Sequence, residues 1–236
     1  RALDDPIGSP RVEELARPGM DVVLLFDDLQ RPTPAHLVIP SMMNRLNKAG
    51  IPDERISGLC AVGTHPVLTM EQLGQKVGQE AFHRMKGHIF SHDPHSKENI
   101  LIGKTHRGTP VELNKLVAQA DLNIGIGECM PHPSAGFGGG CKIILPGVAS
   151  YRTTADHHYT WMRHYHAKVN ILDGNPYFEE IADAGRLGRL AFKLDFVINE
   201  KKEVIKAFAG DPVAEHRKAS EFASSLYHVP MQKLAD

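Results

Sequence analysis

The chain has 236 residues, of which 42% are hydrophobic and 23% are charged, and its formal net charge is −1. This length suits a single α/β domain over residues 1–236, and the balanced charge argues against binding to nucleic acid. No apolar run approaches the roughly 20 residues that cross a bilayer, no signal-peptide pattern is present, and the three cysteines are scattered. We therefore expect a cytoplasmic protein that contacts no membrane.

The first half of the chain alternates between predicted strands and helices. Helices are expected over residues 11–16, 34–49 and 69–82, and strands over residues 21–28, 55–65, 87–93 and 99–105. Pro34 and Gly50 suit the start and the end of the second helix, and Thr69 is a suitable N-cap for the third. The strand over 21–28 is an apolar run that ends in two aspartates, which is typical of a buried parallel strand.

The second half continues the alternation and then changes character. A helix is expected over residues 109–121, a strand over 122–128 and a helix from near Pro176. Residues 190–211 are expected to form a β-hairpin with its turn at 199–202, and residues 212–227 a closing helix. The pattern predicts an α/β fold, with a mostly parallel doubly wound sheet, flanking helices and a C-terminal β-hairpin.

Three of the predicted strands end in reactive side chains, within the sequences DDLQRP, GTH and GECMPH. In an open α/β sheet, ligands bind outside the carboxyl ends of the strands. We therefore expect these three strand ends to converge on one ligand site.

The first two of these ends each allow two interpretations. Asp28 and Arg31 could form an ordinary surface turn, or Arg31 could hold a carboxylate or phosphate while Asp28 orients a neighbouring side chain. His65 could be a surface loop residue, or it could transfer a proton, because imidazole titrates near neutral pH. The residues alone do not decide between these interpretations.

A glycine-rich stretch, AGFGGGCK, precedes Ile143. It could be a flexible loop, or its backbone N–H groups could approach an anion while Lys142 completes the site. It is not a Walker A loop, because Ile143 stands where that motif requires serine or threonine.

Histidines are numerous, at 14 in the chain. A metal site would need imidazoles that converge in space, and adjacent histidines point in different directions, so at most one of His157 and His158 is expected to bind an ion. The segment from His132 to His158 contains neither HxxxH nor HExxH, so a zinc site built by the protein alone is disfavoured.

Taken in order, DDLQRPTP, GTHPVLTMEQL, PHPSAGFGGGCKIILPGVASYRT and the closing HH resemble the N-terminal domain of the nickel-pincer lactate racemase family. The resemblance covers nearly the whole chain, from LDDPIGSPRVEELA to FVINEKKEVIKAFAGD. It is most specific between His132 and His158. It implies an enzyme that racemises or epimerises a 2-hydroxy acid.

The resemblance also implies roles for particular residues. Lys142 matches the lysine that covalently carries the nickel-pincer nucleotide, a nicotinic-acid-derived mononucleotide that holds nickel by carbon and sulfur. His158 matches the nickel ligand. The catalytic acid/base pair would be His65 and His132, and the cofactor- and substrate-binding residues would be Asp28, Arg31, Gly138, Gly139 and Gly140.

The implied reaction is proton-coupled hydride transfer. The hydrogen on the 2-carbon is scarcely acidic, so its removal as hydride, while a base takes the hydroxyl proton, avoids a carbanion. Return of the hydride to the other face of the transient 2-keto acid inverts the centre. Two bases are needed because the two enantiomers direct their hydroxyl groups differently, and the cofactor supplies the hydride chemistry.

The sequence departs from the family pattern at His157, where asparagine is common, so His157 could compete with His158 as the nickel ligand. Cys141 and Gly138 are also unusual at their positions. Family members carry a second domain that closes over the cofactor. We expect this chain to be an N-terminal domain whose partners are that missing C-terminal domain, the cofactor-synthesis enzymes and a small 2-hydroxy acid.

Two other functions remain open on the sequence. The chain could be a non-catalytic phosphate- or nucleotide-binding module, as the glycine loop alone would suggest, or a metal hydrolase that uses only protein ligands. Lactate, malate, aryl-lactates and sugar acids share the same reacting unit, so the sequence does not specify the side chain of the substrate.

Overall fold

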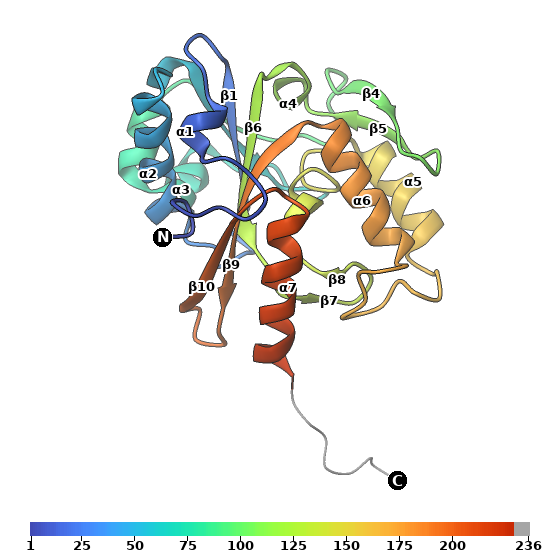
Figure 1. The fold of residues 1–236 in the computed structure, drawn as a ribbon. Helices are drawn as coiled ribbons and strands as arrows, with labels where there is room; N and C mark the ends of the chain where they lie inside the picture. Colours follow the sequence, from blue (N-terminus) through green and yellow to red (C-terminus); the bar gives the residue numbers. More distant parts are fainter. Residues whose placement is uncertain (229–236) are drawn as a thin grey trace.

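A six-stranded sheet with the order β10-β9-β6-β1-β2-β3 forms the centre of the computed structural model, which describes residues 1–228 (Figure 1). Its strands are β1 (Val22–Asp27), β2 (Ile56–Ala61), β3 (Ile89–Ser91), β6 (Leu122–Glu128), β9 (Leu190–Ile198) and β10 (Val204–Gly210). Neighbouring strands are parallel except β9 and β10, which form an antiparallel hairpin. The expected fold class is confirmed.

The central strands are buried along their whole length and are mostly apolar, because both faces of the sheet are covered. Every residue of β1 and of β6 is buried. Val22, Leu24 and Phe26 of β1 pack into one hydrophobic cluster, whereas Val23 and Leu25 pack into another on the opposite face. A parallel sheet buried on both sides produces this continuous apolar pattern.

Helices cover the two faces of the sheet (Figure 1). One face carries α1 (Val12–Leu15), α2 (Ala35–Lys48) and α3 (Met70–Arg84), and the other carries α4 (Lys115–Gln119), α5 (Tyr151–Trp161) and α6 (Pro176–Leu187). The last helix, α7 (Ala214–Tyr227), packs against β9 and β10. Within residues 1–228, no helix combines the length and the apolar character needed to cross a membrane.

The cap predicted at Thr69 is present. Its hydroxyl accepts a hydrogen bond from the backbone N–H of Gln72, and the Gln72 side chain accepts one from the backbone N–H of Thr69. This reciprocal pair satisfies two of the N–H groups that the start of a helix leaves without partners.

The expectation of one helix over residues 109–121 was wrong for its first half. Residues Pro110–Leu113 form strand β5, which pairs with β4 (Ile100–Lys104) in a small sheet of its own. Val111 and Leu113 are buried while Pro110 and Glu112 are partly exposed, and this is the alternation of a strand. Asn114 then caps α4 by accepting the backbone N–H of Leu116.

The glycine-rich segment contains more regular structure than expected. It forms β7 (Pro131–His132), β8 (Gly136–Phe137), the 3₁₀ turn Gly140–Ile143 and then α5. Outside this segment, another 3₁₀ turn lies at Asp53–Arg55, before β2. Ser150 caps α5 by accepting the backbone N–H of Thr153. Helix α5 therefore carries both His157 and His158.

Candidate active site

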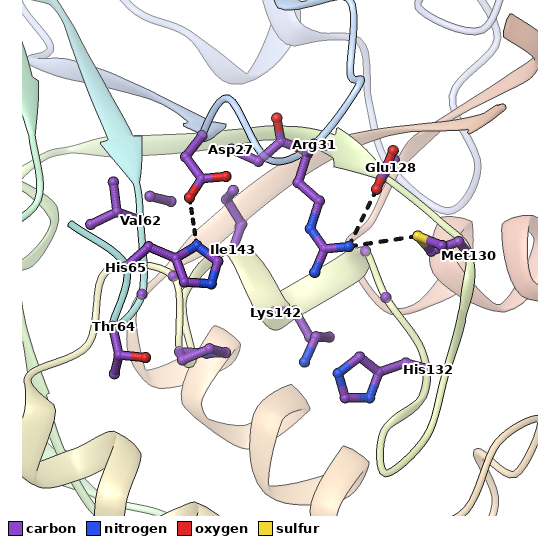
Figure 2. Close-up of a pocket in the computed structure, with 18 of the residues that line it drawn as sticks. Asp27, Arg31, Val62, Thr64, His65, Glu128, Met130, His132, Lys142 and Ile143 are labelled. Carbon is purple, nitrogen blue, oxygen red and sulfur yellow. Dashed lines mark hydrogen bonds and ion pairs between the residues drawn. The ribbon is translucent and has the colours of Figure 1, made fainter. Parts of the chain in front are cut away.

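A cavity of about 490 Å³ lies at the point where the strand order of the sheet reverses (Figure 2). Strand β1 has β2 on one side and β6 on the other, so the connections after β1 and β6 diverge and leave a crevice at their carboxyl ends. Residues from all three predicted strand ends line this cavity. The expected convergence is therefore confirmed, and every predicted site residue lines the cavity except Gly140.

Lys76 holds the turn that follows β1. Its ammonium lies 2.7 Å from Asp27 Oδ1 and donates to the backbone carbonyls of Asp28 and Arg31, at 2.8 and 2.9 Å. Thr33 donates its hydroxyl to the other oxygen of Asp27. These contacts fix the path of the chain between Asp28 and Arg31, so both side chains are presented to the cavity from a rigid turn.

Asp28 orients His65, as one interpretation of the sequence predicted. Oδ2 of Asp28 lies 2.6 Å from Nδ1 of His65, and Asp28 is buried while the His65 side chain is 41% exposed. A carboxylate at this distance favours the tautomer with its proton on Nδ1. The lone pair on Nε2 of His65 then remains available as a base.

Arg31 projects across the cavity toward the end of β6. Its guanidinium lies 3.5 Å from Oε1 of Glu128 and 3.6 Å from the sulfur of Met130 (Figure 2). Burial raises the pKa of Glu128 to about 7, with a further contribution from the charge of Asp27, while Arg31 acts in the opposite direction. Glu128 was not among the predicted site residues, although it ends the strand in GECMPH.

His132 lies on the opposite side of the cavity from His65, with Lys142 between them (Figure 2). Its Nδ1 accepts backbone N–H bonds from Ser134 and Ala135, at 3.2 and 3.0 Å. The pKa of His132 is lowered to about 3, mainly by burial and also by the positive charge of Lys142. The ring is therefore neutral, and it carries its proton on Nε2.

Lys142 follows the glycine loop directly, in the short 3₁₀ turn. Its ammonium lies 5.8 Å from the centroid of the Tyr177 ring. Burial lowers the pKa of Lys142 to about 8, and the charge of Arg31 acts in the same direction. The amine is thus closer to its neutral, nucleophilic form at physiological pH than an exposed lysine would be.

Asp195 and His216 form a floor under the glycine loop. Asp195 accepts the backbone N–H of Gly140 at 2.6 Å, and Nε2 of His216 donates to the carbonyl of Gly138 at 2.8 Å. A Cβ at Gly139, where φ is +88°, would lie 2.5 Å from Asp195, and one at Gly140 would lie 2.7 Å from His216. The glycines allow this close packing, and Asp195 is itself paired with Lys193.

His158, His157 and Tyr177 form a closed chain of hydrogen bonds. Nε2 of His157 lies 3.0 Å from the backbone carbonyl of Tyr177, so it must donate, and Nδ1 of His157 is left as an acceptor. Nδ1 of His158, 3.3 Å away, is then the donor between the two rings. Nε2 of His158 keeps its lone pair and accepts from the Tyr177 hydroxyl at 2.8 Å.

The two adjacent histidines therefore differ in what they can bind. His157 is fully buried and does not line the cavity, whereas His158 does. Burial lowers the pKa of both residues, to about 3 for His157, and the charge of Lys142 contributes in each case. Both rings are neutral, but only His158 lines the cavity, and its Nε2 lone pair accepts from a side-chain hydroxyl.

Comparison with known proteins places the site in context. A family model for the lactate racemase N-terminal domain matches residues 1–170. Lactate racemases from Lactiplantibacillus plantarum and Thermoanaerobacterium thermosaccharolyticum are 36% and 33% identical to this chain, over 98% and 96% of its length. The chain spans 54% and 53% of those two proteins.

Solved structures agree with these relatives. The lactate racemase apoprotein from Thermoanaerobacterium thermosaccharolyticum matches with a TM-score of 0.86 and 32% identity, over 95% of this chain and 54% of that one. A protein from Thermotoga maritima matches with a TM-score of 0.74 and 24% identity, over 91% of this chain and 56% of that one, which shows a shared fold. With a family model that covers most of its length and relatives above 30% identity over nearly all of it, this chain belongs to the lactate racemase family.

Proposed function

We propose that the whole protein racemises or epimerises a 2-hydroxy acid, and that this chain supplies the cofactor attachment point and the acid/base residues. The observation that carries the proposal is the convergence of His65, His132, Arg31 and Lys142 on one cavity, in a member of the lactate racemase family. The remaining length of the relatives supports a further, C-terminal part of the protein as the partner that completes the site.

The cavity fits the nickel-pincer nucleotide that the family resemblance implies. Its volume of about 490 Å³ lies in the range of small-molecule sites, roughly 300–1,000 Å³. The lowered pKa of Lys142 favours the neutral amine that formation of a covalent thioamide link requires. His158 offers a neutral imidazole, which is the form that binds a metal. When bound, the nucleotide would supply a nickel-linked acceptor for hydride.

Of the two adjacent histidines, we propose His158 as the nickel ligand. Nε2 of His157 is committed to a backbone carbonyl and its Nδ1 to the neighbouring ring. Nε2 of His158 is bonded to a side-chain hydroxyl, that of Tyr177, which a metal ion at Nε2 would have to displace. His157 would then fix the orientation of the ligand, as hydrogen-bonded neighbours of metal ligands commonly do.

Arg31 is the proposed anchor for the substrate carboxylate. Its side chain is 41% exposed at the cavity, and its acidic partner there, Glu128, is 3.5 Å away and has a pKa of about 7. A substrate carboxylate that approaches Arg31 would favour protonation of Glu128, because two adjacent carboxylates repel each other when both are charged. The guanidinium would then be free for bidentate binding of the substrate.

His65 and His132 are the proposed acid/base pair. Asp28 leaves Nε2 of His65 ready to accept the hydroxyl proton of one enantiomer. In this structure His132 carries its proton on Nε2, because Nδ1 is held by two backbone N–H groups. To accept the hydroxyl proton of the other enantiomer, His132 would have to release those N–H groups and carry its proton on Nδ1, which would leave Nε2 as the base. The rings of His65 and His132 lie on opposite sides of Lys142 (Figure 2).

The glycine loop has two proposed tasks. Gly138 and Gly139 line the cavity and leave room for the cofactor beside Lys142, whereas Gly140 secures the loop to its floor. Because these glycines have no side chains, the backbone of the loop could lie close to the cofactor.

The test uses the full-length protein produced together with the cofactor-synthesis enzymes. Intact-mass and peptide analysis should find an adduct on Lys142, and a screen of 2-hydroxy acids should detect loss of optical activity. Lys168→Ala serves as a matched control and should retain both the adduct and the activity, whereas Lys142→Ala should lose both.

An active preparation with unmodified Lys142 would refute the proposed attachment. A fully modified protein that racemises no 2-hydroxy acid would instead favour a non-catalytic nucleotide-binding module. Zinc that is retained without the nucleotide, that accompanies hydrolytic activity and that is lost in His158→Ala would favour a hydrolase that uses protein ligands alone.

A further inference from the structure

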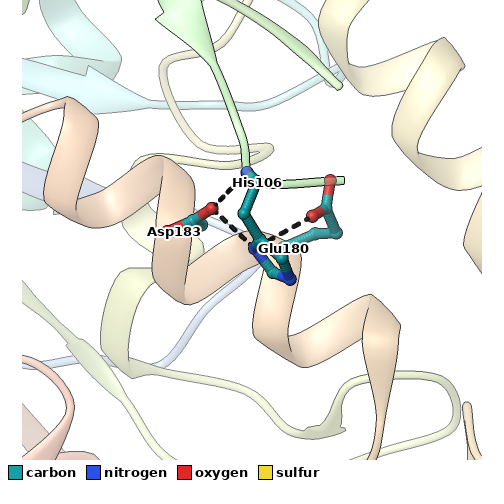
Figure 3. Close-up of side chains that lie close together, drawn as sticks. All are labelled: His106, Glu180 and Asp183. Carbon is teal, nitrogen blue, oxygen red and sulfur yellow. Dashed lines mark hydrogen bonds and ion pairs between the residues drawn. The ribbon is translucent and has the colours of Figure 1, made fainter. Parts of the chain in front are cut away.

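A second cluster of ionisable side chains lies away from the cavity, at the turn between β4 and β5 (Figure 3). His106, in this turn, faces Glu180 and Asp183, which lie three residues apart on one side of α6. Nδ1 of His106 is 2.8 Å from Oδ2 of Asp183 and 3.7 Å from Oε1 of Glu180. These separations bracket the roughly 3.3 Å expected between ligands of a tetrahedral ion with bonds of about 2.0–2.1 Å.

Glu180 is the residue in this cluster that indicates a bound cation. The residue is fully buried, and its Oε2 accepts the hydroxyls of Thr105 and Thr109, at 2.6 and 2.5 Å. Its Oε1 is buried and has no hydrogen-bond partner within residues 1–228, and it is the oxygen that faces His106. A buried carboxylate oxygen without a donor is destabilising, and a cation at this point would remove the penalty.

Asp183 is also arranged to leave one oxygen available. Arg186 pairs with Oδ1 at 2.5 Å, while Oδ2 accepts the backbone N–H of His106 at 2.6 Å and keeps a second lone pair. The side chains of His106, Glu180 and Asp183 thus lie close together, the first from a turn and the other two from one side of α6 (Figure 3). The hydroxyls of the two threonines and the guanidinium of Arg186 hold the carboxylates in place from behind.

We propose that Nδ1 of His106, Oε1 of Glu180 and Oδ2 of Asp183 form a binding site for a divalent transition-metal ion, with Zn²⁺ as the best match. One imidazole and two carboxylates are ligands that zinc accepts, whereas Mg²⁺ and Ca²⁺ favour oxygen ligands only. The His106 side chain is 53% exposed, so a water molecule can complete the coordination from solvent.

The ion would tie the β4–β5 turn to α6. Helix α6 begins at Pro176 and carries Tyr177, the partner of His158 at the cavity, in its first turn. Binding at Glu180 and Asp183 would therefore stabilise the helix that supplies the hydrogen-bond partner of His158. This site does not depend on the proposed racemase function, because none of its ligands lines the cavity.

The competing explanation is a simple ion pair, in which protonated His106 is the only cation between the carboxylates. Titration of Zn²⁺ into the chelator-treated chain, followed by calorimetry and thermal unfolding, separates the two. We expect one equivalent to bind and to raise Tm. Glu180→Gln keeps the shape of the side chain and an acceptor for the threonines, and it should weaken binding by at least roughly tenfold.

Three further variants make the result decisive. His106→Gln, at an exposed position, should also lose this equivalent of Zn²⁺, and it tests the proposal even if Glu180→Gln does not fold. Glu179→Gln, an adjacent carboxylate outside the cluster, and His158→Ala, at the cavity, should both retain it. A Zn²⁺-dependent rise in Tm that is equal in the wild type and in His106→Gln would overturn the proposal, as would the absence of binding to the wild type.

Discussion

Replacement of Lys142 by methionine should stabilise the chain at neutral pH. The pKa of Lys142 falls from 10.5 to about 8 because burial disfavours the ammonium. A difference of about 2.5 pKa units corresponds to about 3.4 kcal/mol of penalty for keeping the charge. Because Lys142 is only half-buried and faces the cavity, solvent relieves part of this penalty, and we expect a gain of about 2–3 kcal/mol.

The pH dependence follows from the direction of the shift. The folded pKa of Lys142 lies below the unfolded value, so the unfolded chain binds more protons between about pH 8 and 10.5. The penalty is fully present below about pH 8 and disappears as the pH approaches 10.5. The advantage of Lys142→Met over the wild type should therefore be largest at pH 7 and should shrink toward zero above pH 10.

The assay is urea unfolding of the chain made without the cofactor-synthesis enzymes, with an unmodified Lys142 verified by intact mass. Lys201→Met, at an exposed position of the β9–β10 turn, is the matched control and should change the free energy of unfolding by less than about 0.5 kcal/mol. The reasoning fails if Lys142→Met is no more stable than the wild type at pH 7, or if its advantage is the same at pH 7 and pH 10.

Three further substitutions probe the packing of the site. Gly139→Ala places a Cβ 2.5 Å from Asp195 at a positive φ and should lower the free energy of unfolding by about 3 kcal/mol, whereas Gly138→Ala, whose Cβ meets nothing closer than 3.7 Å, should cost about 1 kcal/mol or less; equal costs would contradict the close packing described. Tyr177→Phe removes the hydroxyl bonded to His158 and should cost about 1 kcal/mol and shift the ¹⁵N resonance of Nε2 in His158. An unchanged resonance would mean that this hydrogen bond does not form.

The sequence predicted the sheet and its reactive edge because both depend on local patterns. The short, largely apolar segments that became β1 and β6 are typical of buried strands, and the rule for parallel sheets then located Asp28, His65 and His132 at one edge. Strand β5 was mistaken for part of a helix because four residues are too few to distinguish a period of 2 from one of 3.6.

Other parts of the site left no local signal. Asp195 lies within an alternating hairpin strand and His216 within an ordinary amphipathic helix, yet both are buried under the glycine loop. Tyr177 meets His158 only because α5 and α6 pack together. Such long-range contacts follow from the tertiary arrangement, and a single sequence does not reveal them.

The floor beneath the glycine loop affects how this domain can be divided. Its two hydrogen bonds connect positions 55 and 78 residues apart, so the loop that presents Lys142 is completed by β9 and α7, beyond residue 170, where the match to the family model ends. A fragment that stops at that boundary would retain the glycines and all four proposed reactive side chains, which are those of His65, His132, Lys142 and His158. It would lack the two hydrogen bonds that support the glycine loop and Lys142, so we expect the folded site to require the chain through α7.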